Sequence, residues 1–92
     1  MLLEIVSPEG HLFKGEVTAV TVPGVDGEFQ LLNHHANIVS ILADGAIRIA
    51  GNNLDTATES PKFTRDKEQK LSLAIKSGTL EMKDNKIIIL VD

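Results

Sequence analysis

Two turn signals that interrupt an extended chain fall within Val22-Pro23-Gly24-Val25-Asp26-Gly27-Glu28-Phe29-Gln30-Leu31-Leu32-Asn33-His34-His35-Ala36. At Pro23-Gly24 the proline fixes φ and removes a backbone donor, and Asp26-Gly27 is a second turn signal. A short apolar piece, 28–32, comes next, and it ends in polar residues. This pattern predicts a tight double turn on a small β protein.

The length and composition of the chain limit what it can be. Its 92 residues predict one domain, 1–92, which buries roughly 60–65% of its unfolded surface. No cysteine is present, so disulfides and thiolate metal sites are excluded. The net charge of −4 argues against binding to nucleic acid. No run of about 20 apolar residues predicts a membrane span, and the acidic start at Glu4 is unlike a signal peptide.

Alternating apolar and polar residues occur in several short segments separated by turn signals. This spacing predicts an all-β fold, an antiparallel β-sandwich or flattened barrel of about eight to ten short strands. The segment 87–91 is apolar throughout, which predicts a central strand covered on both faces. The predicted strands are 2–7, 16–22, 28–32, 38–42, 47–49, 71–76, 79–83 and 87–91.

The segment 51–69 differs in composition from the rest of the chain. It is rich in turn formers and alternating charges, and it predicts a long polar loop between two strands. Loops of this length are uncommon unless they are functional or mobile. A solvated surface loop or an extended hairpin tip is the simpler interpretation.

None of the candidate catalytic or metal-binding patterns is complete. His34 and His35 are adjacent, so on an extended chain their rings point to opposite faces, whereas zinc needs three or four converging ligands. We expect one inward, hydrogen-bonded histidine and one on the surface. Asp26-Gly27-Glu28 lacks the further oxygens of a calcium loop, and no serine lies in a nucleophile elbow. The sequence therefore predicts no catalytic residues, no metal and no cofactor.

Interaction surfaces are the remaining candidates for function. Asp26-Gly27-Glu28 is either an acidic tip presented by a rigid turn or an ordinary solvated turn, since loop tips are generally polar. The strand 38–42 has apolar residues on both sides. One side carries Ile38 and Leu42 with Ser40, and the other carries Val39 and Ile41. One of these sides should fill the core, and the other is a candidate partner surface.

A series of short motifs occurs in order along the chain: Leu3-Glu4-Ile5-Val6-Ser7-Pro8, Phe13-Lys14-Gly15-Glu16-Val17, Pro23-Gly24, Asp26-Gly27-Glu28-Phe29, His35-Ala36, Ser77-Gly78, Leu80-Glu81-Met82 and Asn85-Lys86. In these motifs and their order the chain resembles the N-terminal β-sandwich of the ε subunit of F-type ATP synthases, over its first fifty residues and again from Leu71 to Asp92. Gln30, Asn37 and Ser77 depart from the family pattern, which usually has glycine, proline and glycine there.

The resemblance implies a non-catalytic rotor subunit of the central stalk, which links the γ subunit to the polar loops of the c-ring and couples proton flow to ATP synthesis. It implies a peripheral location on the cytoplasmic face of the bacterial inner membrane, without insertion into the membrane. Typical members continue into a C-terminal helical hairpin with inhibitory and nucleotide-sensing roles. Because no residue follows Asp92, we expect this chain to lack that switch.

The resemblance also suggests two sets of interface residues. Those expected to face the c-ring are Asp26, Glu28, Phe29, Asn33, His34 and His35. Those expected to face γ are Ser7, Ile38, Ser40 and Leu42. A free-standing β-sandwich that binds a small ligand or another protein is the alternative, and an enzyme is a distant third.

Overall fold

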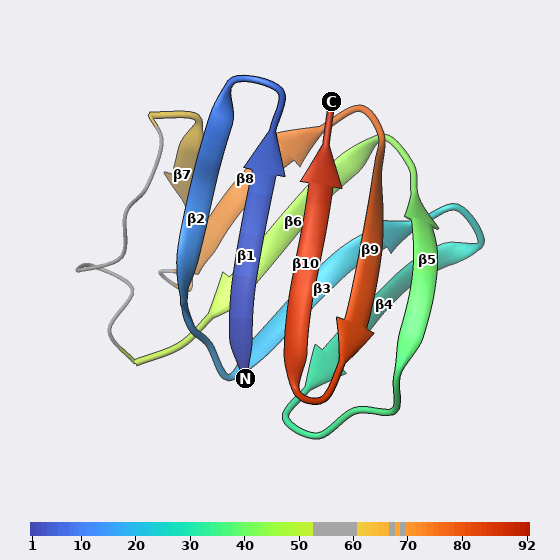
Figure 1. Cartoon of the computed structure of the whole chain (residues 1–92). Helices are drawn as coiled ribbons and strands as arrows, with labels where there is room; N and C mark the ends of the chain where they lie inside the picture. Colours follow the sequence, from blue (N-terminus) through green and yellow to red (C-terminus); the bar gives the residue numbers. More distant parts are fainter. Residues whose placement is uncertain (53–60, 67, 69) are drawn as a thin grey trace.

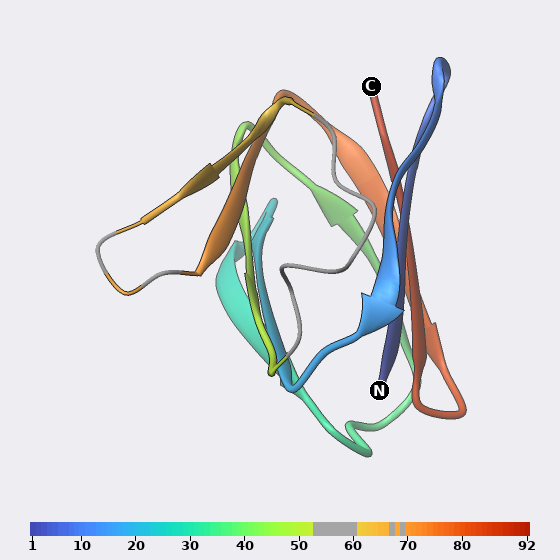
Figure 2. The same cartoon turned by 90° about the vertical axis from the view of Figure 1, so that its left-hand side faces the viewer.

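The computed structural model describes residues 1–52, 61–66, 68 and 70–92. Ten strands are present in these residues, and they form one sheet that folds over itself into two facing layers (Figures 1 and 2). The strands are β1 Leu2–Ser7, β2 Gly10–Glu16, β3 Ala19–Gly24, β4 Gly27–Leu32, β5 Ile38–Leu42, β6 Gly45–Ala50, β7 Phe63–Arg65, β8 Leu71–Ile75, β9 Gly78–Lys83 and β10 Lys86–Val91. The all-β prediction is confirmed.

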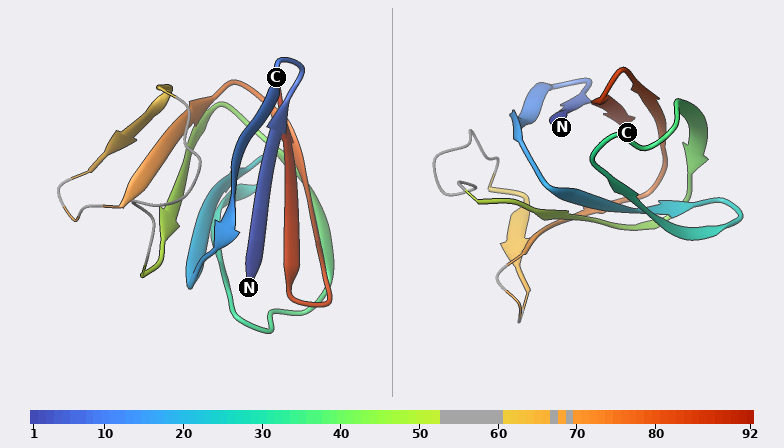
Figure 3. Two further views of the ribbon diagram at one scale, coloured as in Figure 1. Left: turned by 60° about the vertical axis from the view of Figure 1, so that its left-hand side comes forward. Right: turned by 90° about the horizontal axis from the view of Figure 1, so that it is seen from below.

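The strand order around the sheet is β2-β1-β10-β9-β5-β3-β6-β8-β7, with β4 added to β3. The strands β2, β1, β10, β9 and β5 form one layer, and β3, β4, β6, β7 and β8 form the other (Figure 3). The pairing is antiparallel except between β1 and β10, which run parallel. β5 connects the layers, because it pairs along its length with β9 and meets β3 through Gly24 and Leu42.

Alternate side chains of both layers fill the space between them. In β1 the alternation puts Leu3 and Ile5 inside, and in β6 it puts Ile47 and Ile49 inside. The rings of Phe13 and Phe63 lie with centroids 6.1 Å apart, so β7 contributes to this core from beyond the edge of β8. Dense packing of this kind makes a domain stiff.

Three features of the fold differ from the sequence-based expectations. β2 was not among the predicted strands, because its period-2 pattern is broken by a register shift opposite Ile5 and Val6. β7 lies inside the segment predicted to be a polar loop, 51–69. The prediction for residues 53–60, 67 and 69 lies outside the described residues.

The prediction for 87–91 is right about position and wrong about burial. β10 is central, between β1 and β9. However, Leu90 is 52% exposed and Ile88 is only partly buried, so one face of the strand is covered and the other is open. An apolar run predicts burial on both faces only where a second layer covers each of them, and here the layer lies on one side.

Candidate interaction surfaces

The turn between β3 and β4 is held rigidly by backbone contacts. The amide of Val25 donates to the carbonyl of Ile41 at 3.1 Å, and the amide of Ala43 donates to the carbonyl of Pro23 at 2.7 Å. Gly24 is required here, since a Cβ at this position would lie 2.8 Å from both the Gly27 oxygen and a ring carbon of Phe29. The turn is thus anchored to the end of β5.

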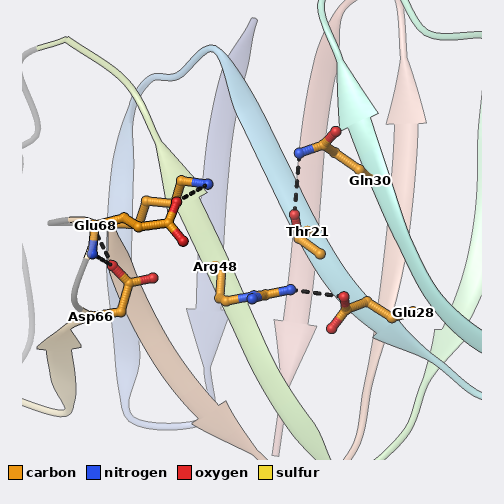
Figure 4. A network of polar contacts seen from close by, with 7 residues as sticks. Thr21, Glu28, Gln30, Arg48, Asp66 and Glu68 are labelled. Atoms are coloured by element: carbon orange, nitrogen blue, oxygen red, sulfur yellow. Dashed lines mark hydrogen bonds and ion pairs between the residues drawn. The ribbon is translucent and has the colours of Figure 1, made fainter.

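Glu28, which was expected to present a negative charge, is ion-paired. Its carboxylate lies 2.7 Å from the guanidinium of Arg48 in β6, and both side chains are about half exposed. Gln30 donates to the Thr21 hydroxyl at 3.5 Å on the same outer surface (Figure 4). Asp66 accepts hydrogen bonds at 2.9 Å from the amides of Glu68 and Lys70. This face is therefore a network of paired charges rather than a purely acidic tip.

The loop between β4 and β5 lies at the other end of β4. Asn33 accepts a hydrogen bond from the amino group of Met1 at 2.5 Å. The amide of His34 donates to Oδ1 of Asn85 at 2.7 Å, and the amide of Asp84 donates to Oδ1 of Asn37 at 3.1 Å. Three asparagine side chains therefore tie this loop to the N-terminus and to the β9–β10 turn.

Both histidines of this loop are exposed, so the expectation of one inward histidine is wrong. His34 adopts a positive φ of 63°, and Nδ1 of His35 lies 2.8 Å from the carbonyl of Ala36. The extended-chain argument fails because the residues form a turn, in which the amide of His35 donates to the carbonyl of Leu32.

The six residues expected to face the c-ring do not gather at one tip. Asp26, Glu28 and Phe29 lie at one end of β4, and Asn33, His34 and His35 lie at the other, about 17 Å away along an extended strand. Phe29 is partly buried and packs against the core. The six residues share one structural feature: they lie on β4 or next to its ends, and in the described structure β4 pairs only with β3.

The expected γ-facing set needs a correction. Leu42 is 1% exposed and fills the core, so it offers no surface on this chain. Ser7 is also buried, and its hydroxyl closes the β1–β2 turn by accepting from the amide of Glu9 and donating to the carbonyl of Gly10, both at 3.2 Å. Ile38 and Ser40 are half-buried. The three β5 residues that were predicted to face γ therefore lie on the side of the strand that faces the core.

The opposite side of β5 continues into an apolar row across the layer. Val39 is 75% exposed and Ile41 is 62% exposed. The register aligns Ile41 with Thr79 of β9, Thr79 with Leu90 of β10, and Leu90 with Val6 of β1. A second row aligns Val39, Glu81, Ile88 and Glu4 in the same way. We call the outward side of these four strands the β5–β10 face.

A separate apolar cavity of about 330 Å³ opens beside the end of β10. It is lined by Leu12, Asp44, Lys62, Leu73, Ala74, Ile75, Lys76, Val91 and Asp92. At its rim the backbone amides of Ser77 and Lys76 donate to Oδ1 of Asp92, each at 3.2 Å. The hydrogen bond from Ser77, with a smaller contribution from Lys76, lowers the pKa of the Asp92 carboxyl below its usual value.

Among the described residues, no three histidine, aspartate or glutamate side chains converge as metal ligands. The same residues contain no helix of the length and hydropathy needed to span a membrane.

Sequence reasoning overlooked Arg48 and the lysine pair Lys83 and Lys86. Arg48 is the single cation of the alternating segment 47–49, which was a usable signal. Lys83 and Lys86 flank the Asp84-Asn85 turn, and that spacing makes them cross-strand partners once the hairpin is assigned.

Comparison with known proteins identifies a family for the whole chain. A family model described as "ATP synthase, Delta/Epsilon chain, beta-sandwich domain" matches residues 1–92. A curated relative named ATP synthase epsilon chain from Campylobacter fetus is 38% identical over 90 residues, which is 98% of this chain and 59% of the relative. A relative of the same name from Helicobacter pylori is 34% identical over 90 residues, which is 98% of this chain and 61% of the relative. The chain thus spans about three fifths of the curated relatives it matches.

Solved structures support the fold. A chain in the mitochondrial ATP synthase central stalk and c-ring of Tetrahymena thermophila aligns over 99% of this chain and 62% of its own length, with a TM-score of 0.73 and 14% identity. A chain in the mitochondrial ATP synthase of Euglena gracilis aligns over 99% of this chain and 49% of its own length, with a TM-score of 0.77 and 20% identity.

Proposed function

Because this chain belongs to the family of ATP synthase delta/epsilon-chain β-sandwich domains, we propose that it is a non-catalytic coupling module of a proton-translocating ATP synthase. In this role it joins the γ subunit to the polar loops of the c-ring on the cytoplasmic face of a bacterial inner membrane. Rotation of the ring is passed to γ through it. The observation that carries the proposal is the family match over residues 1–92.

The physical properties of the domain suit a torque coupling. Such a part must be stiff, and a densely packed core between two sheet layers resists deformation. The domain measures 28 × 26 × 26 Å and exposes 5407 Å². Two interfaces of standard size, about 800 Å² on each partner, would cover roughly a third of that surface. The surface is therefore large enough for γ and the ring together.

We place the c-ring contact along β4. The strand lies at an edge, and both of its ends carry exposed polar residues, so an edge laid against the ring engages both ends at once. Asp26, Glu28 and Phe29 then meet the ring at one end, and Asn33, His34 and His35 meet it at the other. The hydrogen bonds that hold the backbone at both ends of β4 reduce the conformational entropy lost on docking.

We place the γ contact on the β5–β10 face. Val39, Ile41 and Leu90 are its most exposed apolar side chains, and contiguous exposed apolar residues mark interaction sites. Ile38 and Ser40 contribute from the margin of β5, while Leu42 and Ser7 support the strand and the neighbouring turn from inside. This placement uses the same strand that the sequence predicted to contact γ, but it uses the side of the strand that carries Val39 and Ile41.

A second candidate is a free-standing binding module. The apolar cavity beside Leu12, Ile75 and Val91 favours it, because pockets of about 300 Å³ or more with a few polar groups accept small ligands. In this alternative the chain would act without γ.

Co-purification with γ tests the proposal. The full chain is expressed with the γ subunit and the c-ring of the same organism, and the expected result is a stoichiometric complex that contains both partners. The double variant Val39→Asp/Ile41→Asp should lose γ while its circular dichroism spectrum stays unchanged. A chain that binds neither γ nor the ring, and instead retains a small molecule in the apolar cavity, would overturn the proposal in favour of the second candidate.

A further inference from the structure

The strand β4 has a regular edge that no other strand of the described structure covers. It pairs with β3 over all 6 of its residues without a register shift, and its other side has no strand beside it among the described residues. A free strand edge presents a row of unpaired backbone donors and acceptors, which is a template for another strand. The group that fits this edge is therefore an extended backbone.

The proline of β3 shows which residues of β4 direct their backbone groups outward. Pro23 has no N–H, and its carbonyl accepts from the amide of Ala43, so its pair with Glu28 is not a hydrogen-bonded one. Hydrogen-bonded and non-bonded pairs alternate along an antiparallel ladder. It follows that Glu28, Gln30 and Leu32 direct their amides and carbonyls away from β3, toward the free edge.

The other strand edges of the described structure are protected in ways that β4 is not. β2 contains a register shift and carries Lys14, and β7 is only 3 residues long. The outer edge of β5 is closed at one end, where backbone hydrogen bonds tie it to the β3–β4 turn. β4 has no shift, no proline and no basic residue, and its one charge, on Glu28, is paired with Arg48 (Figure 4). Its sequence therefore does little to discourage pairing with another strand.

We infer that the β4 edge binds the β4 edge of a second copy of this chain, antiparallel and about a twofold axis at Gln30. This register places Gln30 opposite Gln30, and it places Glu28 opposite Leu32 of the second copy. It engages the outward backbone groups of all three residues in both copies. It also keeps the two Glu28 carboxylates apart, whereas a register that placed them opposite each other would destabilise the pair.

The two ends of β4 complement each other in this arrangement. Asp26 lies just before the strand, His34 and His35 lie just after it, and all three are exposed. Because the two strands run antiparallel, the Asp26 turn of each copy lies beside the histidine loop of the other. A carboxylate then meets imidazole hydrogen-bond donors at both ends of the interface. Leu32, which is 52% exposed, packs on the aliphatic part of Glu28.

The expected dimer is weak. A single pair of short strands buries less than the roughly 800 Å² on each partner that a standard interface buries. The inference does not rest on the proposed function, because it concerns the chain by itself. It adds a consequence to that function: a second copy and the c-ring would compete for β4, so the dimer is a state of the chain outside the assembled complex.

Sedimentation equilibrium of the isolated chain tests the inference. The average mass should rise from that of a monomer toward that of a dimer between about 10 μM and 1 mM. Gln30→Lys places two like charges across the axis and should keep the chain monomeric over this range. Gln30→Pro removes an outward amide without removing a bond to β3, and it should act in the same way. Circular dichroism checks that both variants are folded.

The matched control is Thr64→Lys, which makes the same charge change at an exposed position of the edge strand β7. It should self-associate like the wild type. A wild-type chain that stays monomeric at about 1 mM overturns the inference, and so does a dimer that Gln30→Lys leaves intact.

Cysteine cross-linking locates the axis. The chain contains no cysteine, so Gln30→Cys supplies a single thiol. Opposite residues of a hydrogen-bonded pair have Cα atoms about 5.5 Å apart, which is within the range of a disulfide. Oxidation by air with a copper catalyst should therefore link two Gln30→Cys chains, while Thr64→Cys chains should stay unlinked; the reverse result would contradict the register. Co-purification with γ is a separate measurement, so a monomeric chain that binds γ would refute this inference and leave the proposed function standing.

Discussion

The carboxylate of Glu28 in β4 lies 2.7 Å from the guanidinium of Arg48 in β6, and the strand between them is β3. The pair bridges the outer surface over two strand spacings at the end of the sheet where the β3–β4 turn projects. It fixes the direction of Glu28 and partly neutralises it. Any contact that Glu28 makes with a partner is therefore shared with Arg48.

Under the proposed contact of β4 with the c-ring, the single variant Glu28→Lys should weaken energy coupling, because it places a second positive charge beside Arg48 and reverses the charge that position 28 presents to the ring. ATP-driven proton pumping should fall more than ATP hydrolysis. The free energy of unfolding should change by no more than about 1 kcal/mol, because exposed ion pairs contribute little.

The charge-swapped variant Glu28→Arg/Arg48→Glu is the control for that experiment. It restores an ion pair within the chain but leaves the charge reversed at position 28. Its free energy of unfolding should return to that of the wild type. Its ATP-driven proton pumping should stay reduced if the c-ring interacts with the charge at position 28. Full recovery of pumping would mean that the pair has only a structural role.

Truncation of Ile89 should destabilise the fold by about 2–4 kcal/mol, because the side chain is fully buried and its loss leaves a cavity. Leu90 is the matched control in the same strand. It is 52% exposed, so Leu90→Ala should cost less than about 1 kcal/mol. Urea unfolding followed by circular dichroism measures both. Equal losses would contradict the assignment of inner and outer faces to β10.

Replacement of Asn85 tests the connection between the β4–β5 loop and the β9–β10 turn. Asn85→Ala loses the hydrogen bond from the His34 amide and replaces a residue that tolerates a φ of 63° with one that tolerates it less well, so we expect a loss of about 1–2 kcal/mol. Asn85→Gly loses the same hydrogen bond but tolerates the backbone angle, and it should cost less. Hydrogen exchange at the His34 amide should accelerate in both variants. Unchanged exchange would show that the amide is protected by another group.

We expect protonation of the Asp92 carboxyl to account for part of the stability that the fold loses in acid. Its pKa is lowered in the folded chain, mainly by the amide of Ser77, so its stabilising effect is present above the unfolded pKa and is lost as the pH falls through the folded pKa. Asp92→Asn should therefore flatten the dependence of stability on pH below about pH 4. Urea midpoints at several pH values measure this slope. Asp26→Asn, at an exposed turn residue, is the control, and a flattening as large as that of Asp92→Asn would contradict the assignment.

Local sequence patterns determined eight of the ten strands in the described residues, all except β2 and β7, and most of the core. A side chain alternates between faces with a period of two, so apolar residues such as Leu3, Ile5, Ile47 and Ile49 identify the buried side of a strand wherever their neighbours are polar. Turn residues mark where each strand ends, and this is why the β9–β10 hairpin could be placed. The family resemblance came from the same residues and needed no coordinates.

Only the tertiary structure decided which side of an ambiguous strand is covered. In β5 and β10 both sides are apolar, and local alternation contains no information about where the second layer lies. The fold places Leu42 and Ile89 inside and leaves Val39, Ile41 and Leu90 outside. It also pairs Glu28 with Arg48 and places Lys83 opposite Lys86. Such contacts depend on the register and the order of strands, which are set by packing between residues distant in the chain.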